Sequence, residues 1–326
     1  MRIHIHNAAD DPLFAITPHQ WDEAAARAGA AGLGHSVSFG ETCPALVAAL
    51  AEAEVLIARP AALAAAFPAP APRLRLIFST SAGVDALAPF TSLPPGAILV
   101  CNRGIHGEKA GDYAIMALLM LAMEMPALLA AQRAKQWEPR YSPTLAGRRL
   151  LIVGLGTLGA AAAARAAAFG MEVTGITRTG TPHSACRTVL PVAALDLALT
   201  EAEFLLLACP LTPATRNLLD RRRLALLPAG AGVVNIGRGA VLDEDALADR
   251  LDAGHLGGAV LDVFAQEPLP SGHRFWRTRN LFLTPHISAD DPATYNPRTL
   301  DRFFAALGAL VHGTPIPNIV DYTLGY

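Results

Sequence analysis

The sequence has little charge and little cysteine, and both scarcities narrow the possible functions. Charged residues make up 17% of the 326 residues, the net charge is −2, and no basic run is longer than Arg221-Arg222-Arg223. Nucleic acid and anionic membrane surfaces are therefore not expected as partners. The four cysteines are far apart and match no metal-ligand spacing, so we expect no metal site and a reducing, cytoplasmic location.

The sequence also lacks a long uninterrupted apolar run. The longest such stretch, residues 113–132, contains Glu124 and Pro126, which argues against a membrane span. The first six residues alternate as in a strand and contain no apolar signal-peptide segment. Hydrophobic residues nevertheless make up 52% of the chain, which is enough for buried cores. We therefore expect a soluble protein of about two domains.

Apolar runs alternate with helical stretches along the whole chain, which is typical of parallel sheets flanked by helices. In the first part we expect helices near 18–30 and 42–51, loops at Pro60, 68–72 and 94–96, and strands at 2–6, 55–58, 75–79 and 98–101. A long helix follows at about 107–125. The last element that we expect is a helix at 299–311. Between the two helices we expect six strands, at 150–153, 172–177, 204–208, 233–236, 259–263 and 281–283.

The second series of strands predicts a complete six-strand dinucleotide fold, and the tail after it is too short for a domain of its own. We predict an α/β protein with two Rossmann-like, doubly wound parallel-sheet domains and a cleft between them. Residues 1–102 and 290–326 form the substrate domain, and residues 103–289 form the dinucleotide-binding domain. The two chain crossings, near 102–104 and 287–290, suit a hinge.

A glycine fingerprint follows the first strand of the second series. Gly154 permits a tight turn, Gly156 lets the backbone approach a pyrophosphate, and Gly159 allows the next helix to pack closely on the strand. The N–H groups of that helix's first turn bind the anion. Because strand, fingerprint and helix occur in this order, we predict a dinucleotide site rather than a structural turn. Its residues are Gly154, Leu155, Gly156, Thr157, Leu158 and Gly159.

The next strand ends in Thr177, Arg178 and Thr179, where an NAD-selective site has an acidic residue for the ribose 2′-hydroxyl. No carboxylate is present to repel a 2′-phosphate, and Arg178 can pair with it while the two hydroxyls assist. Alternatively, Arg178 only stacks on the adenine and tolerates both cofactors. We expect NADP(H) to be preferred, with NAD(H) possible.

Three further strand ends carry Arg238, Glu267 and His286, which a parallel sheet brings to one edge. Singly, each is more often a surface ion-pair partner, a satisfied polar residue or a turn residue. Together, behind the fingerprint, they favour reduction of a 2-keto acid. Arg238 would bind the carboxylate and carbonyl, and His286 would give a proton to the new alkoxide. Glu267 would raise the histidine pKa and fix its tautomer.

With these residues the chain resembles the D-isomer-specific 2-hydroxyacid dehydrogenase family over essentially its full length. The matching segments are 81–85, 154–159, 210–212 with Thr215, 235–239, 261–268 and 284–286. The resemblance implies that Arg238, Glu267 and His286 are the catalytic triad. It implies a substrate-carboxylate cradle formed by the backbone of Ala82, Gly83 and Val84. Further cofactor contacts would come from Cys209, Pro210, Thr215, Ile236, Gly237, Arg238, Asp262 and His286, with Asp262 holding the nicotinamide carboxamide.

Within the family, Arg178 and the chain's last ten residues are most similar to glyoxylate/hydroxypyruvate reductase relatives. The resemblance implies a small 2-keto or 2-hydroxy acid substrate and a homodimer formed through the helix at 107–125. Alternatives are a phosphoglycerate or phosphite dehydrogenase of the same family, or a dinucleotide-gated, corepressor-like binding module. Arg59, which follows a strand, either contacts a second anionic or hydroxyl group of the substrate or pairs on the surface.

Overall fold

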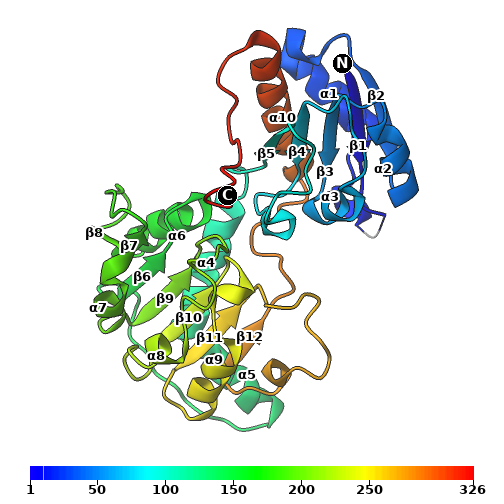
Figure 1. Ribbon diagram of the computed structural model, residues 1–326. Coiled ribbons are helices and arrows are strands. Elements are labelled where there is room, and N and C mark those ends of the chain that lie inside the picture. Colours follow the sequence, from blue (N-terminus) through cyan, green and yellow to red (C-terminus); the bar gives the residue numbers. More distant parts are fainter. Residues whose placement is uncertain (10) are drawn as a thin grey trace. The chain divides into compact units, whose positions relative to one another are not determined.

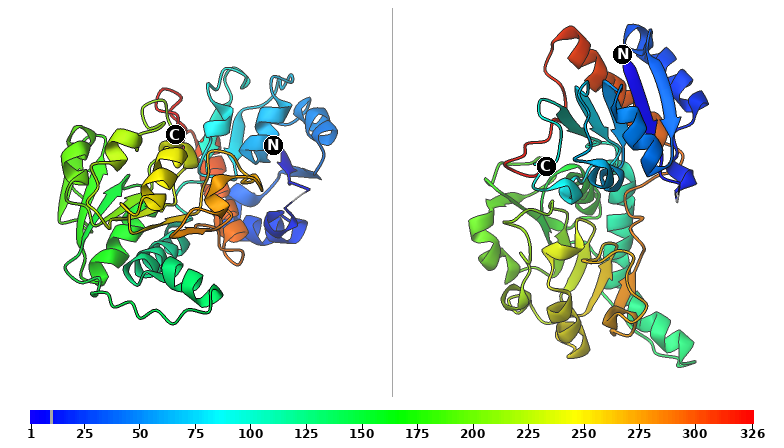
Figure 2. Two further views of the ribbon diagram at one scale, coloured as in Figure 1. Left: turned by 90° about the horizontal axis from the view of Figure 1, so that it is seen from below. Right: turned by 45° about the vertical axis from the view of Figure 1, so that its right-hand side comes forward.

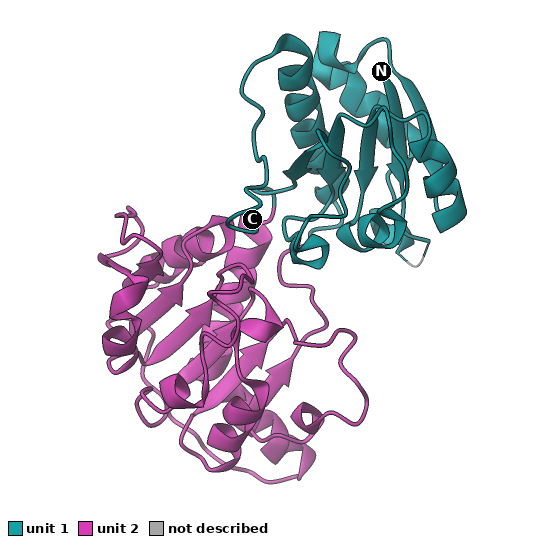
Figure 3. Cartoon of the chain, viewed as in Figure 1, with its two compact units in different colours: residues 1–105, 291–326 teal, residues 106–290 magenta. Residues whose placement is uncertain are grey.

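The computed structural model describes residues 1–9 and 11–326, which divide into two compact units (Figure 3). Unit 1 is Met1–Ile105 with Asp291–Tyr326, and unit 2 is His106–Asp290. The strands of unit 1 pair in the order β2-β1-β3-β4-β5, and those of unit 2 in the order β12-β11-β10-β9-β6-β7-β8. All of these pairs are parallel, which confirms the predicted α/β class with two parallel-sheet domains.

The sheet of unit 1 is covered by helices on both faces (Figure 1). Its strands are β1 (Arg2–His6), β2 (Ser36–Gly40), β3 (Val55–Ala58), β4 (Leu76–Ser79) and β5 (Ile98–Cys101). Alternate residues of β3 point to opposite faces, so Ile57 packs with α1 (Pro18–Ala28) and α10 (Tyr295–His312). Leu56 packs on the other face with α2 (Cys43–Leu50) and α3 (Pro60–Ala66).

The last part of the chain belongs to unit 1. In α10, Phe303 and Phe304 pack against Trp21 of α1, and Asp301 forms an ion pair with Arg27 at 2.8 Å. After α10, the N–H of Val320 donates to the carbonyl of Leu99 in the edge strand β5 at 2.9 Å. The tail therefore completes the sheet cover and protects its edge.

Unit 2 has the same two-sided construction. Its strands are β6 (Arg149–Val153), β7 (Glu172–Thr177), β8 (Thr188–Pro191), β9 (Phe204–Leu207), β10 (Gly232–Asn235), β11 (Gly258–Leu261) and β12 (Leu281–Leu283). One face packs against α4 (Gly107–Ala122) and α6 (Thr157–Ala168). The other face packs against α7 (Leu195–Leu199), α8 (Arg221–Leu224) and α9 (Glu244–Asp252). Parallel pairing brings the carboxyl ends of all these strands to one edge.

Short 3-10 helices occupy several loops of both units. They span Pro12–Phe14, Gly29–Gly32, Asp85–Leu87, Val192–Ala194, Gly239–Val241 and Arg274–Trp276. In the described residues no single helix is long and apolar enough to cross a membrane. Only α4 and α5 (Met125–Arg133) together reach the required length and composition, and their axes differ by 64°.

Several predicted elements were wrong or incomplete. The second sheet has seven strands rather than six, because β8 was missed, and β2 was missed in the first sheet. Both are edge strands with partly exposed side chains, so they lack the buried apolar run that marks a central strand. Pro60 begins α3 rather than a loop, because proline suits the first helical position. The predicted helix at 107–125 ends at Ala122, and α5 begins after Glu124, whose φ is +50°.

Candidate active site

The glycine loop after β6 is tight and open to solvent. Gly154 has a φ of +94°, and its N–H donates to the carbonyl of Ile176 at 2.8 Å. A Cβ on Gly159 would lie 1.8 Å from the carbonyl oxygen of Gly154, so only glycine fits there. Gly156 caps α6 without a side-chain hydrogen bond, and a Cβ on it would meet nothing within 4 Å. The N–H groups of the first turn of α6, which starts at Thr157, therefore remain available, and the loop fits a pyrophosphate.

The other residues of the fingerprint, Leu155 and Leu158, are half-buried around this loop. At the end of the neighbouring strand β7, Arg178 is exposed. Within the described residues no hydrogen bond or ion pair of its side chain is found. The hydroxyl of Thr177 accepts the N–H of Gly180 at 2.8 Å, and the hydroxyl of Thr179 pairs with that of Thr181 at 2.8 Å. Arg178 therefore offers an uncommitted guanidinium beside the glycine loop, whereas both threonine hydroxyls already have partners.

The loop after β9 separates the glycine loop from the loop after β10. A Cβ on Gly154 would lie 2.7 Å from the backbone nitrogen of Cys209, and a Cβ on Gly237 would lie 2.9 Å from its carbonyl oxygen. Burial raises the pKa of the Cys209 thiol to about 12, so this side chain is a packing group rather than a nucleophile. The hydroxyl of Thr215 donates to the carbonyl of Pro210 at 2.7 Å and so fixes the rest of the loop.

Arg238 follows β10 and is held by its own strand end. The fully buried side chain of Asn235 accepts the N–H of Gly237 and donates to the carbonyl of Arg238, each at 3.1 Å. Arg238 also donates from Nη1 to the carbonyl of Gly237 at 2.8 Å, and Ile236 beside it is buried. The backbone that presents the guanidinium is therefore fixed by an amide that the sequence analysis did not single out.

Glu267 and His286 are in direct contact, as the sequence predicts. Nδ1 of His286 lies 2.7 Å from Oε2 of Glu267, and Oε1 of Glu267 accepts the N–H of Phe264 at 2.9 Å. Since a carboxylate only accepts, Nδ1 carries the proton of the neutral ring. Nε2 is then the nitrogen that can exchange a proton with a bound molecule, and the imidazole is about half exposed.

The electrostatics of this pair favour an imidazolium beside a carboxylate. The hydrogen bond and charge of Glu267 raise the pKa of His286, although burial and Arg238 act in the opposite direction. Burial alone would raise the pKa of Glu267, but the hydrogen bonds from His286 and Phe264 and the nearby charge of Arg238 lower it overall. Arg238 therefore acts on both members of the pair. The structure gives the three predicted residues one electrostatic environment.

A buried network holds the loop that carries His286. Asp262 is fully buried, and its Oδ1 accepts the hydroxyl of Thr284 at 2.6 Å and the N–H of Ile287 at 2.9 Å. Its Oδ2 accepts the N–H of Ser288 at 2.9 Å. Because the hydroxyl of Thr284 donates its hydrogen bond to Asp262, its oxygen accepts the hydrogen bond from the hydroxyl of Tyr113, at 2.6 Å. Asp262 thus organises the His286 loop; a contact between Asp262 and a carboxamide stays a prediction.

In unit 1, the segment after β4 presents free backbone donors. Ser79 donates from its hydroxyl to the carbonyl of Ser81 at 2.9 Å and accepts the N–H of Ser81 at 3.2 Å. In the described part of the chain, no acceptor is found for the backbone N–H groups of Ala82, Gly83 and Val84. Successive unpaired N–H groups of this kind suit a carboxylate.

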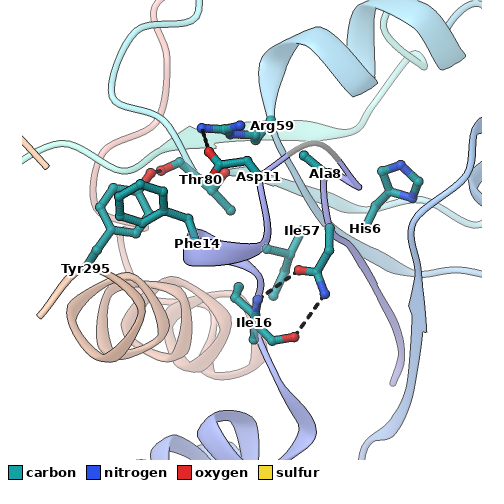
Figure 4. Close-up of a pocket in the computed structure, with 10 residues that line it drawn as sticks. His6, Ala8, Asp11, Phe14, Ile16, Ile57, Arg59, Thr80 and Tyr295 are labelled. Atoms are coloured by element: carbon teal, nitrogen blue, oxygen red, sulfur yellow. Dashed lines mark hydrogen bonds and ion pairs between the residues drawn. The ribbon is translucent and has the colours of Figure 1, made fainter. Parts of the chain in front are cut away.

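Arg59 lines a recess of unit 1 that is open to solvent (Figure 4). Its Nη2 forms an ion pair with Oδ2 of Asp11 at 2.8 Å, so the charge of Arg59 is balanced. Across the recess, the hydroxyl of Tyr295 donates to the carbonyl of Thr80 at 2.6 Å. His6 is buried, and its Nδ1 has no partner among the described residues.

Asp11, Asn235 and the network of Asp262 were missed as working parts of the site. Asn235 and Asp262 are polar residues at the ends of apolar strands, and that position is a signal for a buried role. Asp11 follows β1 at the same sheet edge as Arg59, but nothing in its local sequence indicates an ion pair. No group of three or more His, Cys, Asp or Glu side chains in residues 1–9 and 11–326 could hold a metal ion.

Comparison with known proteins identifies the family. Residues 115–288 match the NAD-binding domain of D-isomer specific 2-hydroxyacid dehydrogenases. This chain belongs to that family. The predicted family is thus confirmed, and its members are NAD(P)-dependent oxidoreductases acting on 2-hydroxy acids.

Two relatives differ in how much of them the chain covers. The chain is 31% identical to glyoxylate/hydroxypyruvate reductase A of Serratia proteamaculans over 260 residues, which are 78% of this chain and 82% of that protein. It is 33% identical to D-3-phosphoglycerate dehydrogenase of Mycobacterium bovis over 247 residues, 75% of this chain but only 47% of the relative. The chain therefore spans about half the length of the phosphoglycerate dehydrogenase that it matches.

Solved structures resemble the whole chain. A D-isomer specific 2-hydroxyacid dehydrogenase from Xanthobacter autotrophicus, in complex with NADPH and MES, has a TM-score of 0.82 at 29% identity, with 99% of each chain covered. The NADPH-dependent glyoxylate/hydroxypyruvate reductase of Sinorhizobium meliloti, in complex with NADP and sulfate, has a TM-score of 0.81 at 26% identity, with both chains covered fully.

Proposed function

We propose that this chain is an NADPH-dependent reductase of small 2-keto acids of the glyoxylate and hydroxypyruvate type, forming D-2-hydroxy acids. The observation that carries this proposal is the 2.7 Å hydrogen bond between His286 and Glu267, in a unit whose glycine loop fits a pyrophosphate. The charge of Arg238 acts on the pKa of this histidine. Family membership supports the same class of reaction.

The chemistry assigns one task to each residue of the triad. The bound cofactor supplies the hydride that C2 of the keto acid accepts. Protonated His286 donates the proton of Nε2 to the carbonyl oxygen, which becomes the hydroxyl of the product. Glu267 stabilises the imidazolium before this transfer, because it accepts the proton of Nδ1 in a hydrogen bond. Arg238 binds the substrate's carboxylate and carbonyl oxygens and draws electrons away from C2.

Arg178 supports NADP(H) as the preferred cofactor, with NAD(H) also accepted. Its exposed guanidinium lies at the end of β7, which pairs with β6 directly before the glycine loop. No ion pair of this guanidinium is found within the described residues. The Xanthobacter and Sinorhizobium neighbours, which were solved with NADPH and NADP, support the same preference.

Two features of unit 1 support a small substrate with a single negative charge. The N–H groups of Ala82, Gly83 and Val84 suit one carboxylate. Arg59 would be the residue to bind a second anion such as a phosphate, but Asp11 already balances its charge at 2.8 Å. A second carboxylate or a phosphate would meet the negative Asp11 as well. This feature favours a glyoxylate-type reductase over a phosphoglycerate dehydrogenase.

The test is steady-state reduction of a panel of 2-keto acids with NADPH and with NADH. We expect kcat/KM for glyoxylate or hydroxypyruvate with NADPH to exceed that for 3-phosphohydroxypyruvate by at least about tenfold, which corresponds to about 1.4 kcal/mol. Turnover only of the phosphorylated acid, or of none of the panel, would contradict the proposal. His286→Ala serves as the background control.

We also propose that the protein is a homodimer formed through α4 and the segment after it. In unit 2, α5 and the following segment project from the body of the unit (Figure 2). This segment carries Trp137 and Tyr141, whose side chains are 95% and 94% exposed, and Met116 and Met123 are also exposed. Burial of such apolar surface stabilises an interface between copies. Multi-angle light scattering of the wild type and of Trp137→Arg would test this, since the variant should dissociate to monomers.

A further inference from the structure

A second carboxylate–imidazole pair, Glu244 and His273, lies in unit 2 beside the loop that carries Glu267. Glu244 is the first residue of α9, and its Oε1 accepts the N–H of Ala265 at 2.7 Å. Its Oε2 lies 3.6 Å from Nε2 of His273, within ion-pair distance. The side chain of Glu244 is only 15% exposed, which is unusual for a glutamate at a helix start.

The neutral ring of His273 is oriented with Nε2 towards Glu244. Its Nδ1 accepts the N–H of Phe275 at 3.3 Å, and its ring packs edge-on against that of Phe275 at 4.7 Å. The proton of the neutral ring is therefore on Nε2, the nitrogen that faces Glu244. At 3.6 Å this contact is longer than a hydrogen bond, so His273 confines the carboxylate by packing and electrostatic attraction.

The peptide that Glu244 holds adjoins the supports of two members of the triad. The N–H of Phe264 donates to Glu267, and the next N–H, that of Ala265, donates to Glu244. A Cβ on Gly239, next to Arg238, would lie 1.9 Å from the carbonyl carbon of Phe264, so the Arg238 loop rests directly on this peptide. A shift of the peptide would therefore move the supports of Glu267 and Arg238 together.

We propose that Glu244, oriented by His273, is a positioning residue that fixes the Phe264–Ala265 peptide. By fixing this peptide, Glu244 maintains the hydrogen bond between Glu267 and His286. Its catalytic meaning rests on the proposed reductase function, but its effect on His286 does not. Neither Glu244 nor His273 touches the reacting groups in this scheme. They act only through the loop.

The charges around the two pairs are compatible with this role. Burial raises the pKa of Glu244, and the neighbouring charges of Asp245 and Glu267 act in the same direction. The N–H of Ala265 and the charge of His273 oppose that rise. The charged groups that face His286 are Glu267, Arg238 and Asp262, and Glu244 is not among them. A change at Glu244 should therefore reach His286 through geometry and not through direct charge.

Two substitutions separate geometry from charge. Glu244→Asp keeps the charge but is one methylene shorter, so the carboxylate no longer reaches the N–H of Ala265. Glu244→Gln loses the charge but keeps an acceptor oxygen for the N–H of Ala265, and its amide nitrogen then lies on the side of His273, where the 3.6 Å contact is not a hydrogen bond. The readout is the titration midpoint of His286, followed by NMR of the full-length protein labelled at its histidine rings, with His286→Gln identifying the signal.

If Glu244 positions the loop, Glu244→Asp should lower the His286 midpoint by at least ~0.5 pH unit, and Glu244→Gln should stay within ~0.2 unit of the wild type. Asp245→Asn is the matched control, because Asp245 is the next residue of α9 and its side chain is 78% exposed. It should leave the midpoint unchanged. The inference would be overturned if the His286 midpoint did not shift in Glu244→Asp, or if it shifted as far in Glu244→Gln as in Glu244→Asp.

The same variants distinguish this inference from the proposed function. The basic limb of the pH profile for 2-keto acid reduction should move to lower pH in Glu244→Asp and stay in place in Glu244→Gln. A wild-type protein that reduces none of the panel contradicts the proposed function, while the NMR midpoints still decide the role of Glu244. A purely structural role would lower thermal stability and total activity without moving either the midpoint or the limb.

Discussion

The backbone N–H of His286 donates to the carbonyl of Asp262 at 2.9 Å, while His286 itself has a φ of +54°. This left-handed conformation is uncommon for a residue other than glycine and costs of order 1–3 kcal/mol. The side chain of Asp262 holds the following two residues by their N–H groups. Asp262 therefore imposes on His286 a backbone conformation that the histidine would not adopt by itself.

Asp262→Asn should lower both stability and turnover. The amide has one acceptor oxygen, so its NH₂ group faces either the N–H of Ser288 or the Thr284 hydroxyl and Ile287 N–H that Oδ1 accepts. We expect a loss of about 1–3 kcal/mol in the free energy of unfolding, measured by urea denaturation. Asp245→Asn, an exposed acid of the same unit, should change stability by less than about 0.5 kcal/mol. Equal effects of the two variants would contradict the role of Asp262.

His286→Ala should reduce kcat for 2-keto acid reduction by at least ~10², because no other group in the triad can donate the proton. KM should change much less, since in the proposed scheme Arg238 still binds the carboxylate. Steady-state kinetics at the pH optimum measure both constants. Near-normal turnover of the variant would remove His286 from the role of acid.

Glu267→Gln should narrow the pH range of reduction from its basic side. Reduction needs protonated His286, and the hydrogen bond and charge of Glu267 raise the pKa of this histidine. Activity is therefore retained at low pH and lost as the pH rises through that pKa. Without the carboxylate the pKa falls, so the basic limb of kcat/KM should move to lower pH. A limb that keeps its place would make Glu267 a structural residue only.

Arg178→Ala should erase the preference for NADPH. In the wild type we expect the ratio of kcat/KM for NADPH to that for NADH to exceed one, because a guanidinium pairs with the 2′-phosphate. The variant should lose mainly the NADPH value, through a higher KM. Arg187→Ala is a suitable control, since Arg187 is an exposed arginine of the same region paired with Glu172 at 2.8 Å. A wild type that prefers NADH would contradict the assignment.

Asp11→Asn should widen the range of substrates. The substitution keeps the size of the side chain but leaves the charge of Arg59 unbalanced. We expect kcat/KM for 3-phosphohydroxypyruvate to rise relative to that for glyoxylate by a factor of about 10, as one charge–charge contact of about 1.4 kcal/mol would give. The double variant Asp11→Asn with Arg59→Gln should cancel the gain. If the ratio stays constant in Asp11→Asn, the recess does not select by charge.

Much of the site could be predicted because each signal is local. A glycine pattern between strand and helix predicts a phosphate loop, and a parallel sheet carries the residues after its strands to one edge. Arg238, Glu267 and His286 follow three such strands, so their proximity is a consequence of topology. The contact between Glu267 and His286 agrees with this reasoning. The edge strands β2 and β8 escaped it, because their side chains are too exposed to give a clear apolar run.

The sequence by itself determined the two parallel sheets, the glycine loop and the strand ends that carry the triad. The tertiary structure alone decided that Asp11 forms an ion pair with Arg59 and that Asp262 accepts a hydrogen bond from Thr284. It also decided that Glu244 accepts a hydrogen bond from the peptide beside Glu267. The reason is physical. These contacts join segments that are distant in the chain and have ordinary local sequences, so their partners are chosen only when the packed sheets bring buried polar groups within hydrogen-bond reach.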